Sequence, residues 1–178
     1  MRIPRKKIKI CLLSDGKKGH LIKSEGIIYA LSLVTEVEVF TFNISWKIGF
    51  LRKALLWSKI LRSLLPKKIC LNNFINNDYD FIVSSGGATE WINAKIAKDH
   101  KIPNLYIGSL RHLQKEAFTY LAIEKYEDYS GFLDVPIAPN AINQKQINVL
   151  SEKYYPNKIN KIFSILIGGN GSGIKWTA

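Results

Sequence analysis

Cysteine is scarce in this sequence, which has Cys11 and Cys70 as its only thiols in 178 residues. Two cysteines cannot form the framework of a disulfide-rich secreted protein, and each lies in an apolar stretch, so we expect both to be small buried side chains in a reducing compartment. Long apolar runs are also missing, because no stretch reaches the roughly 18 uncharged residues that cross a membrane. The apolar segment near the N-terminus is too short for a secretion signal. These absences favour a cytoplasmic protein.

Several catalytic signatures are missing too. The histidines His20, His100 and His112 are scattered and show no metal-site spacing to a cysteine or carboxylate, so we expect no metal centre. The chain has no GxxxxGK[ST] phosphate loop, no GxGxxG dinucleotide fingerprint and no GxSxG nucleophile elbow. Zinc-finger and RNA-recognition signatures are absent as well, so nucleic acid is not an expected partner.

Basic residues, in contrast, are abundant. The chain has 26 Lys+Arg against 14 Asp+Glu, which gives a net charge of +12, and 47% of its residues are hydrophobic. The length and the apolar fraction are those of an ordinary globular domain. An excess of positive charge favours anionic partners, such as phosphorylated ligands or an anionic membrane surface, although drift in lysine content alone would also produce it.

Strand-like and helix-like segments alternate along the chain. We expect buried strands over 7–14, 36–43, 80–84, 103–109, 118–123 and 162–167, and helices over 21–33, 46–65, 90–100 and 144–154. This order predicts an α/β fold, with a Rossmann-like, mostly parallel sheet and helices on both faces. Because residues 162–173 read as a strand and a glycine turn with no helix after them, we expect a domain over 1–158 and the start of a truncated second domain over 159–178.

The loop after the first expected strand is the strongest candidate for chemistry. It reads Ser14-Asp15-Gly16-Lys17-Lys18-Gly19-His20. Its two glycines allow a ligand to approach the backbone, its lysines add positive charge, and the following helix start favours an anion. An imidazole titrates near neutral pH, so His20 could serve as a general base. The alternative is a histidine that makes a structural hydrogen bond at the start of the helix.

Two further glycine-rich loops follow expected strands. Gly86 and Gly87, with Thr89 after them, either let a substrate lie against bare backbone or form a tight turn capped by the threonine. Near the C-terminus, Gly168, Gly169, Asn170 and Gly171 would suit a diphosphate cradle. In an open α/β sheet, ligands gather at the carboxyl ends of the strands, where all three loops are expected.

The expected helix over 46–65 is basic and amphipathic, and no acidic residue occurs between Glu38 and Asp78. Such a helix could lie on an anionic membrane, or it could pack on the sheet with its lysines in solvent. The residues that would face the membrane are Trp46, Arg52, Trp57, Lys59 and Arg62.

The segment LLSDGKKGHLIKSEGIIYAL resembles the opening of the mitochondrial fission (elongate-mitochondria) family, and the turn after DFIVSS and the final ILIGGNGSGIKWTA are similar to later landmarks of that family. Lys18 departs from the pattern, since the family has proline there. The bacterial members are regarded as glycosyltransferases of the GT-B type, in which two Rossmann-like domains face each other across a cleft.

This resemblance implies a metal-independent transfer of sugar from a nucleotide-sugar donor, as co-substrate, to a membrane-associated, lipid-linked or cell-envelope acceptor at the inner membrane face, with no other cofactor. It makes His20 the expected base, with Asp15 beside it. Substrate-binding positions would be Gly16, Lys17, Gly19, Gly86, Gly87 and Thr89, and the donor would be bound at Gly168, Gly169, Asn170 and Gly171. Because the second domain is missing, we expect the fragment to be inactive. The alternative is a non-catalytic membrane adaptor, a role linked to plant members.

Overall fold

A computed structural model describes residues 7–44, 78–111, 113–123, 133–134 and 138–155 of the chain. The chain divides into two compact units, Met1–Ala141 and Ile142–Ala178. Within the second unit, the described residues form one helix, α6 (Gln144–Tyr154), whose first turn is capped by the Asn143 side chain. The sheet and the candidate site belong to the first unit.

The described strands form one six-stranded sheet in which every neighbouring pair is parallel, in the order β2-β1-β3-β4-β5-β6. The strands are β1 (Ile8–Ser14), β2 (Val37–Asn43), β3 (Phe81–Ser85), β4 (Asn104–Ile107), β5 (Tyr120–Ile123) and β6 (Leu133–Asp134). The helices of this unit are α1 (Lys18–Ser32) and α5 (Glu90–His100), with a 3-10 turn, η1 (Lys115–Ala117). The predicted α/β class and Rossmann-like parallel sheet are confirmed.

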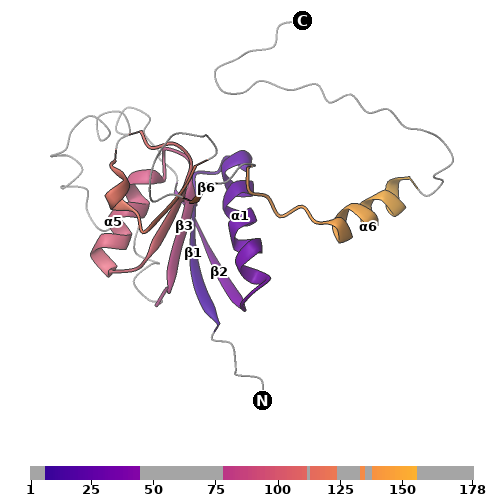
Figure 1. Ribbon diagram of the computed structural model, residues 1–178, viewed down its shortest axis with the longest axis horizontal. Helices are drawn as coiled ribbons and strands as arrows, with labels where there is room; N and C mark the ends of the chain where they lie inside the picture. The colour runs from indigo at the N-terminus through magenta and orange to yellow at the C-terminus, as the bar shows by residue number, and fades with distance from the viewer. Residues whose placement is uncertain (1–6, 45–77, 112, 124–132, 135–137, 156–178) are drawn as a thin grey trace, which may run out of the picture. The chain divides into compact units, whose positions relative to one another are not determined.

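The two helices cover opposite faces of the sheet (Figure 1). Alternate residues of β1 point to the two sides, as the pleat of a strand requires. Ile10 and Leu12 pack with Ile28 of α1, while Cys11 and Leu13 pack against α5 in a second cluster. A strand that is buried on both faces reads as a continuous apolar run, which is why IKICLL marks the centre of the sheet.

The order of strands reverses at β1. From β1 the chain passes through α1 to β2 on one side, whereas β3, on the other side of β1, leads through α5 to β4. Right-handed crossovers in opposite directions place their helices on opposite faces, as observed. The carboxyl ends of β1 and β3 therefore form the topological switch point, the usual place for a ligand in this class of fold.

Some boundaries differ from those predicted. Helix α1 begins at Lys18, three residues before the expected start, so the first candidate loop includes the first helical turn. Ile22 of this helix is 47% exposed, whereas Ser24, Gly26 and Ile28 are buried. The predictions for 46–65, for 162–167 and for Cys70 lie outside the described residues, whereas Cys11 is buried as expected.

Candidate functional site

The site begins where β1 ends. The Gly16 N–H donates to Ser14 Oγ at 3.1 Å, and the Lys17 N–H donates to Asp15 Oδ1 at 3.2 Å, so the loop closes on its own side chains. The other carboxylate oxygen, Asp15 Oδ2, lies 2.9 Å from Nδ1 of His20 in the first turn of α1. The Asp15 side chain is 5% exposed and that of His20 is 33% exposed, so the carboxylate is covered while the imidazole remains accessible.

This arrangement fixes which ring nitrogen is available. An ionised carboxylate can only accept, so Nδ1 of His20 donates to Asp15 and, in a neutral imidazole, Nε2 keeps a free lone pair. A histidine oriented through one nitrogen by a carboxylate, with the other nitrogen free, is the arrangement that a general base requires. The pair can therefore take a proton from a hydroxyl group that approaches Nε2.

The glycine turn after β3 lies against the imidazole of His20. Parallel pairing sets Leu13 beside Ser84, so Asp15 and Gly86 follow at neighbouring strand ends. A Cβ on residue 86 would meet the His20 ring, at 2.6 Å from Cε1 and closer still to Nδ1. Gly86 also has φ of +94°, which side chains rarely adopt. Only glycine fits both conditions, so the turn is shaped around the imidazole.

Thr89 stabilises this turn through hydrogen bonds and is not exposed to solvent. It is fully buried, and its hydroxyl donates to the carbonyl oxygens of Ser85 at 3.1 Å and Gly86 at 2.9 Å. The Thr89 N–H also donates to the Gly86 carbonyl at 2.9 Å. The predicted capping bond is different, since the side chain bonds backward to the turn and makes no bond to the first turn of α5. Thr89 thus shapes the turn rather than contacting a substrate.

A third loop, which was not predicted from the sequence, lies at the same edge. It follows β4 at Gly108 and carries Arg111, whose side chain lies against Gly87, with Cδ 3.2 Å from the position of a Cβ there. Glu90, the first residue of α5, is 1% exposed and accepts from the N–H groups of Arg111 and Leu113. The available signal was a glycine at the end of an expected strand, followed by an isolated arginine.

The predicted site residues therefore divide into three groups. The structure brings together the Asp15–His20 pair and the Gly86–Gly87 turn, while Gly16, Lys17 and Gly19 lie exposed in the loop beside them. Gly168, Gly169, Asn170 and Gly171 lie outside the described residues. The same holds for the predicted membrane-facing residues Trp46, Arg52, Trp57, Lys59 and Arg62.

Burial also acts on a tyrosine beneath this edge. Tyr106 of β4 is 2% exposed, and this burial raises the pKa of its hydroxyl above the ordinary value. The carboxylates of Glu90 and Asp15 raise that pKa further, whereas the Arg111 guanidinium lowers it. The tyrosine hydroxyl therefore lies within electrostatic reach of Asp15, Glu90 and Arg111 and remains neutral at physiological pH.

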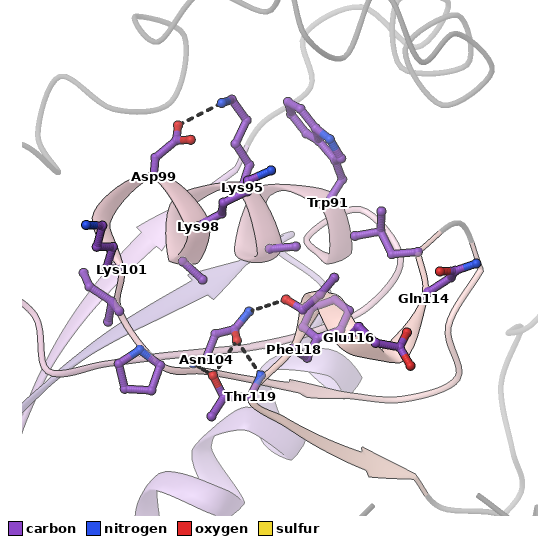
Figure 2. Close-up of a pocket in the computed structure, with 16 residues that line it drawn as sticks. Trp91, Lys95, Lys98, Asp99, Lys101, Asn104, Gln114, Glu116, Phe118 and Thr119 are labelled. Carbon is purple, nitrogen blue, oxygen red and sulfur yellow. Dashed lines mark hydrogen bonds and ion pairs between the residues drawn. The ribbon is translucent and has the colours of Figure 1, made fainter. Parts of the chain in front are cut away.

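A groove elsewhere in this unit lies between α5, the start of β4 and η1 (Figure 2). Its polar floor is internally bonded: Asn104 Nδ2 donates to Asn93 Oδ1 at 2.7 Å, and the Thr119 N–H donates to Asn104 Oδ1 at 2.8 Å. On its rim, Lys95 pairs with Asp99 at 2.8 Å. Asn104 is the first residue of β4, so this groove lies at the amino end of that strand, away from the switch point. Its side chains hold the fold together rather than forming a reactive group.

Carboxylates elsewhere do not add a metal site. The sequence has an Asp-x-Asp pattern at Asp78–Asp80, which is not among the predicted site residues. Asp80 precedes β3 at the amino edge of the sheet, where its carboxylate accepts from the Lys9 N–H at 2.9 Å. Among the described residues, no group of three or more His, Cys, Asp and Glu side chains lies close enough to hold a metal ion.

Comparisons of the chain with protein-family models, with curated proteins and with solved structures find no match. No helix within the described ranges is both long and apolar enough to cross a membrane.

Proposed function

We propose that the protein is a GT-B-type glycosyltransferase that moves a sugar from a nucleotide-sugar donor to a hydroxyl group of a membrane-associated or cell-envelope acceptor. The observation that carries this proposal is the Asp15–His20 pair, seated on the Gly86 turn at the switch point of a parallel sheet. Such a position is where α/β folds bind ligands, and the pair offers a base that remains accessible. The resemblance of the SDGKKGH loop to the fission family supports the same reaction.

The reaction needs one proton transfer from the acceptor. Nε2 of His20 takes the hydroxyl proton while the acceptor oxygen attacks the anomeric carbon of the donor sugar. A bond forms between that oxygen and the anomeric carbon, and the bond from the anomeric carbon to the donor phosphate oxygen breaks. The nucleoside diphosphate leaves with that electron pair. Asp15, hydrogen-bonded to Nδ1, stabilises the imidazolium that forms.

The test is donor-dependent sugar transfer by the protein. A panel of nucleotide sugars is incubated with the protein and a cell-envelope lipid extract, and release of nucleoside diphosphate is measured. We expect His20→Ala to reduce the rate by about a hundredfold or more, the usual contribution of a general base. His100→Ala is the matched control, because His100 is exposed at the last position of α5.

Equal transfer rates in His20→Ala and wild type would remove the base from the reaction. If no donor is turned over while the protein binds anionic vesicles, the adaptor alternative is favoured instead. That alternative depends on residues 46–65, which lie outside the described part of the chain.

A further inference from the structure

Arg111 lies at the Gly86–Gly87 turn. Its side chain is exposed and lies along the Gly87 backbone, with Nε 3.4 Å and one terminal nitrogen 3.6 Å from the position of a Cβ on that glycine. Among the described residues, no carboxylate forms an ion pair with its guanidinium. Because the His20 ring lies against the preceding glycine, Gly86, the arginine and the imidazole flank the same two-residue turn.

The backbone that carries this arginine is fixed by a buried charge. Both oxygens of Glu90 accept from the Arg111 N–H at 3.3 Å, and Oε1 accepts from the Leu113 N–H at 2.9 Å. A buried carboxylate is costly unless it is well hydrogen-bonded. Here the bonds go to the loop after β4, so the carboxylate holds the start of that loop against α5. The guanidinium is thereby presented from an anchored backbone.

A second observation at this edge also points to a polar ligand. Tyr106 is only 2% exposed. Its hydroxyl oxygen lies 3.9 Å from the position that a Cβ on Gly108 would occupy. In the described part of the chain, no group forms a hydrogen bond with this hydroxyl, although buried hydroxyl groups are nearly always paired. A water molecule or a ligand oxygen near Gly108, in the loop that carries Arg111, would supply a partner for this hydroxyl.

We infer that Arg111 binds a phosphate group of a substrate at the Gly86–Gly87 turn, beside the imidazole of His20. The inference rests on the proposed function in one respect, since that function supplies phosphorylated substrates. A guanidinium binds phosphate through two parallel hydrogen bonds, and no lysine can reproduce this geometry. The phosphate belongs either to the diphosphate of the donor or to a phosphorylated acceptor.

The test measures phosphate binding, which needs no turnover. Two probes are titrated into the full 178-residue chain at low salt by calorimetry: inorganic pyrophosphate for the donor, and glucose 6-phosphate for a phosphorylated acceptor. We expect wild type to bind at least one probe and Arg111→Gln to weaken that binding by about tenfold or more, as loss of a charge-assisted bidentate contact requires. Lys98→Gln is the matched control, because it removes one exposed cation from α5.

The same titrations distinguish a donor phosphate from an acceptor phosphate. They also distinguish failure of the Arg111 inference from failure of the proposed function. Tighter binding of pyrophosphate assigns the site to the donor, and tighter binding of the sugar phosphate assigns it to the acceptor. The titrations need no turnover, so loss of transfer in His20→Ala tests the base alone, and loss of probe binding in Arg111→Gln tests the phosphate site alone. Absence of binding in wild type, or equal binding by wild type and a folded Arg111→Gln variant, would overturn the inference and leave the role of His20 intact.

Discussion

At the scale of single residues, the Asp15–His20 pair leads to a prediction about the tautomer of the His20 imidazole as well as about the rate of sugar transfer. In Asp15→Asn, the new amide can donate to Nδ1, which moves the imidazole proton to Nε2 and removes the lone pair that accepts from the substrate. We expect the transfer rate to fall by about a hundredfold or more. The nitrogen chemical shifts of His20 should report the changed tautomer in the folded protein. An unchanged spectrum together with an unchanged rate would show that the carboxylate does not set the state of the ring.

Gly86 gives a second prediction at this scale. A methyl group at this position would enter the His20 ring and would have to adopt a positive φ of 94°. We expect Gly86→Ala to lower the free energy of unfolding by about 1–3 kcal/mol, from backbone strain and overpacking, and to displace the imidazole. Chemical denaturation measures this loss. Gly19→Ala in the first turn of α1 is the control, since nothing lies within 4 Å of its added methyl group, and we expect no loss of stability.

At the scale of elements, Glu90 joins α5 to the loop after β4. Glu90→Gln leaves a single acceptor oxygen and turns an amide donor toward backbone N–H groups that are themselves donors. We expect a loss of about 1.5–3 kcal/mol in the free energy of unfolding, the usual value for hydrogen bonds to a charged group. Glu116→Gln in η1 is the control, because that side chain is exposed. Similar unfolding midpoints for the two variants would contradict the anchoring role.

Helix α1 makes a close contact through Gly26. A Cβ there would lie 2.6 Å from Cα of Asn140, so the chain at 139–140 crosses the helix in direct backbone contact. Alanine at an interior helix position normally adds about 1 kcal/mol of stability relative to glycine. We nevertheless expect Gly26→Ala to destabilise the protein by about 1–2 kcal/mol, because the overpacking exceeds that gain. A raised melting temperature would show that residues 139–140 do not pack there.

The elements were largely predictable from the sequence, whereas part of the site was not. The sequence pattern located β1 to β5, and strands buried on both faces leave uninterrupted apolar runs such as FIV in β3. It missed the two-residue β6, which carries no periodic signal. The Asp15–His20 pair was predictable because both members lie in one loop. The roles of Glu90 and Arg111 depend on contacts between segments 21 residues apart, which neither spacing nor composition encodes.

At the scale of the whole molecule, buried groups in the sheet should make the protein less stable at alkaline pH. Burial raises the pKa of the Cys11 thiol, and burial with the nearby carboxylates raises that of Tyr106. In the unfolded chain these groups titrate near their ordinary values of about 8.5 and about 10. Above those values the unfolded state loses protons that the folded state keeps, so the stability is complete below about pH 8 and is lost as the pH rises.

We therefore expect the free energy of unfolding to fall between about pH 9 and pH 11, by up to about 1.4 kcal/mol per pH unit for each fully linked group. Urea unfolding at a series of pH values measures the slope. Loss of lysine charge acts in the opposite direction, because it relieves the self-repulsion of a chain with a charge of +12. Tyr106→Phe separates the two effects, since it keeps the lysines and removes the hydroxyl. A slope above pH 10 that is identical in this variant and in wild type would show that the Tyr106 hydroxyl does not contribute.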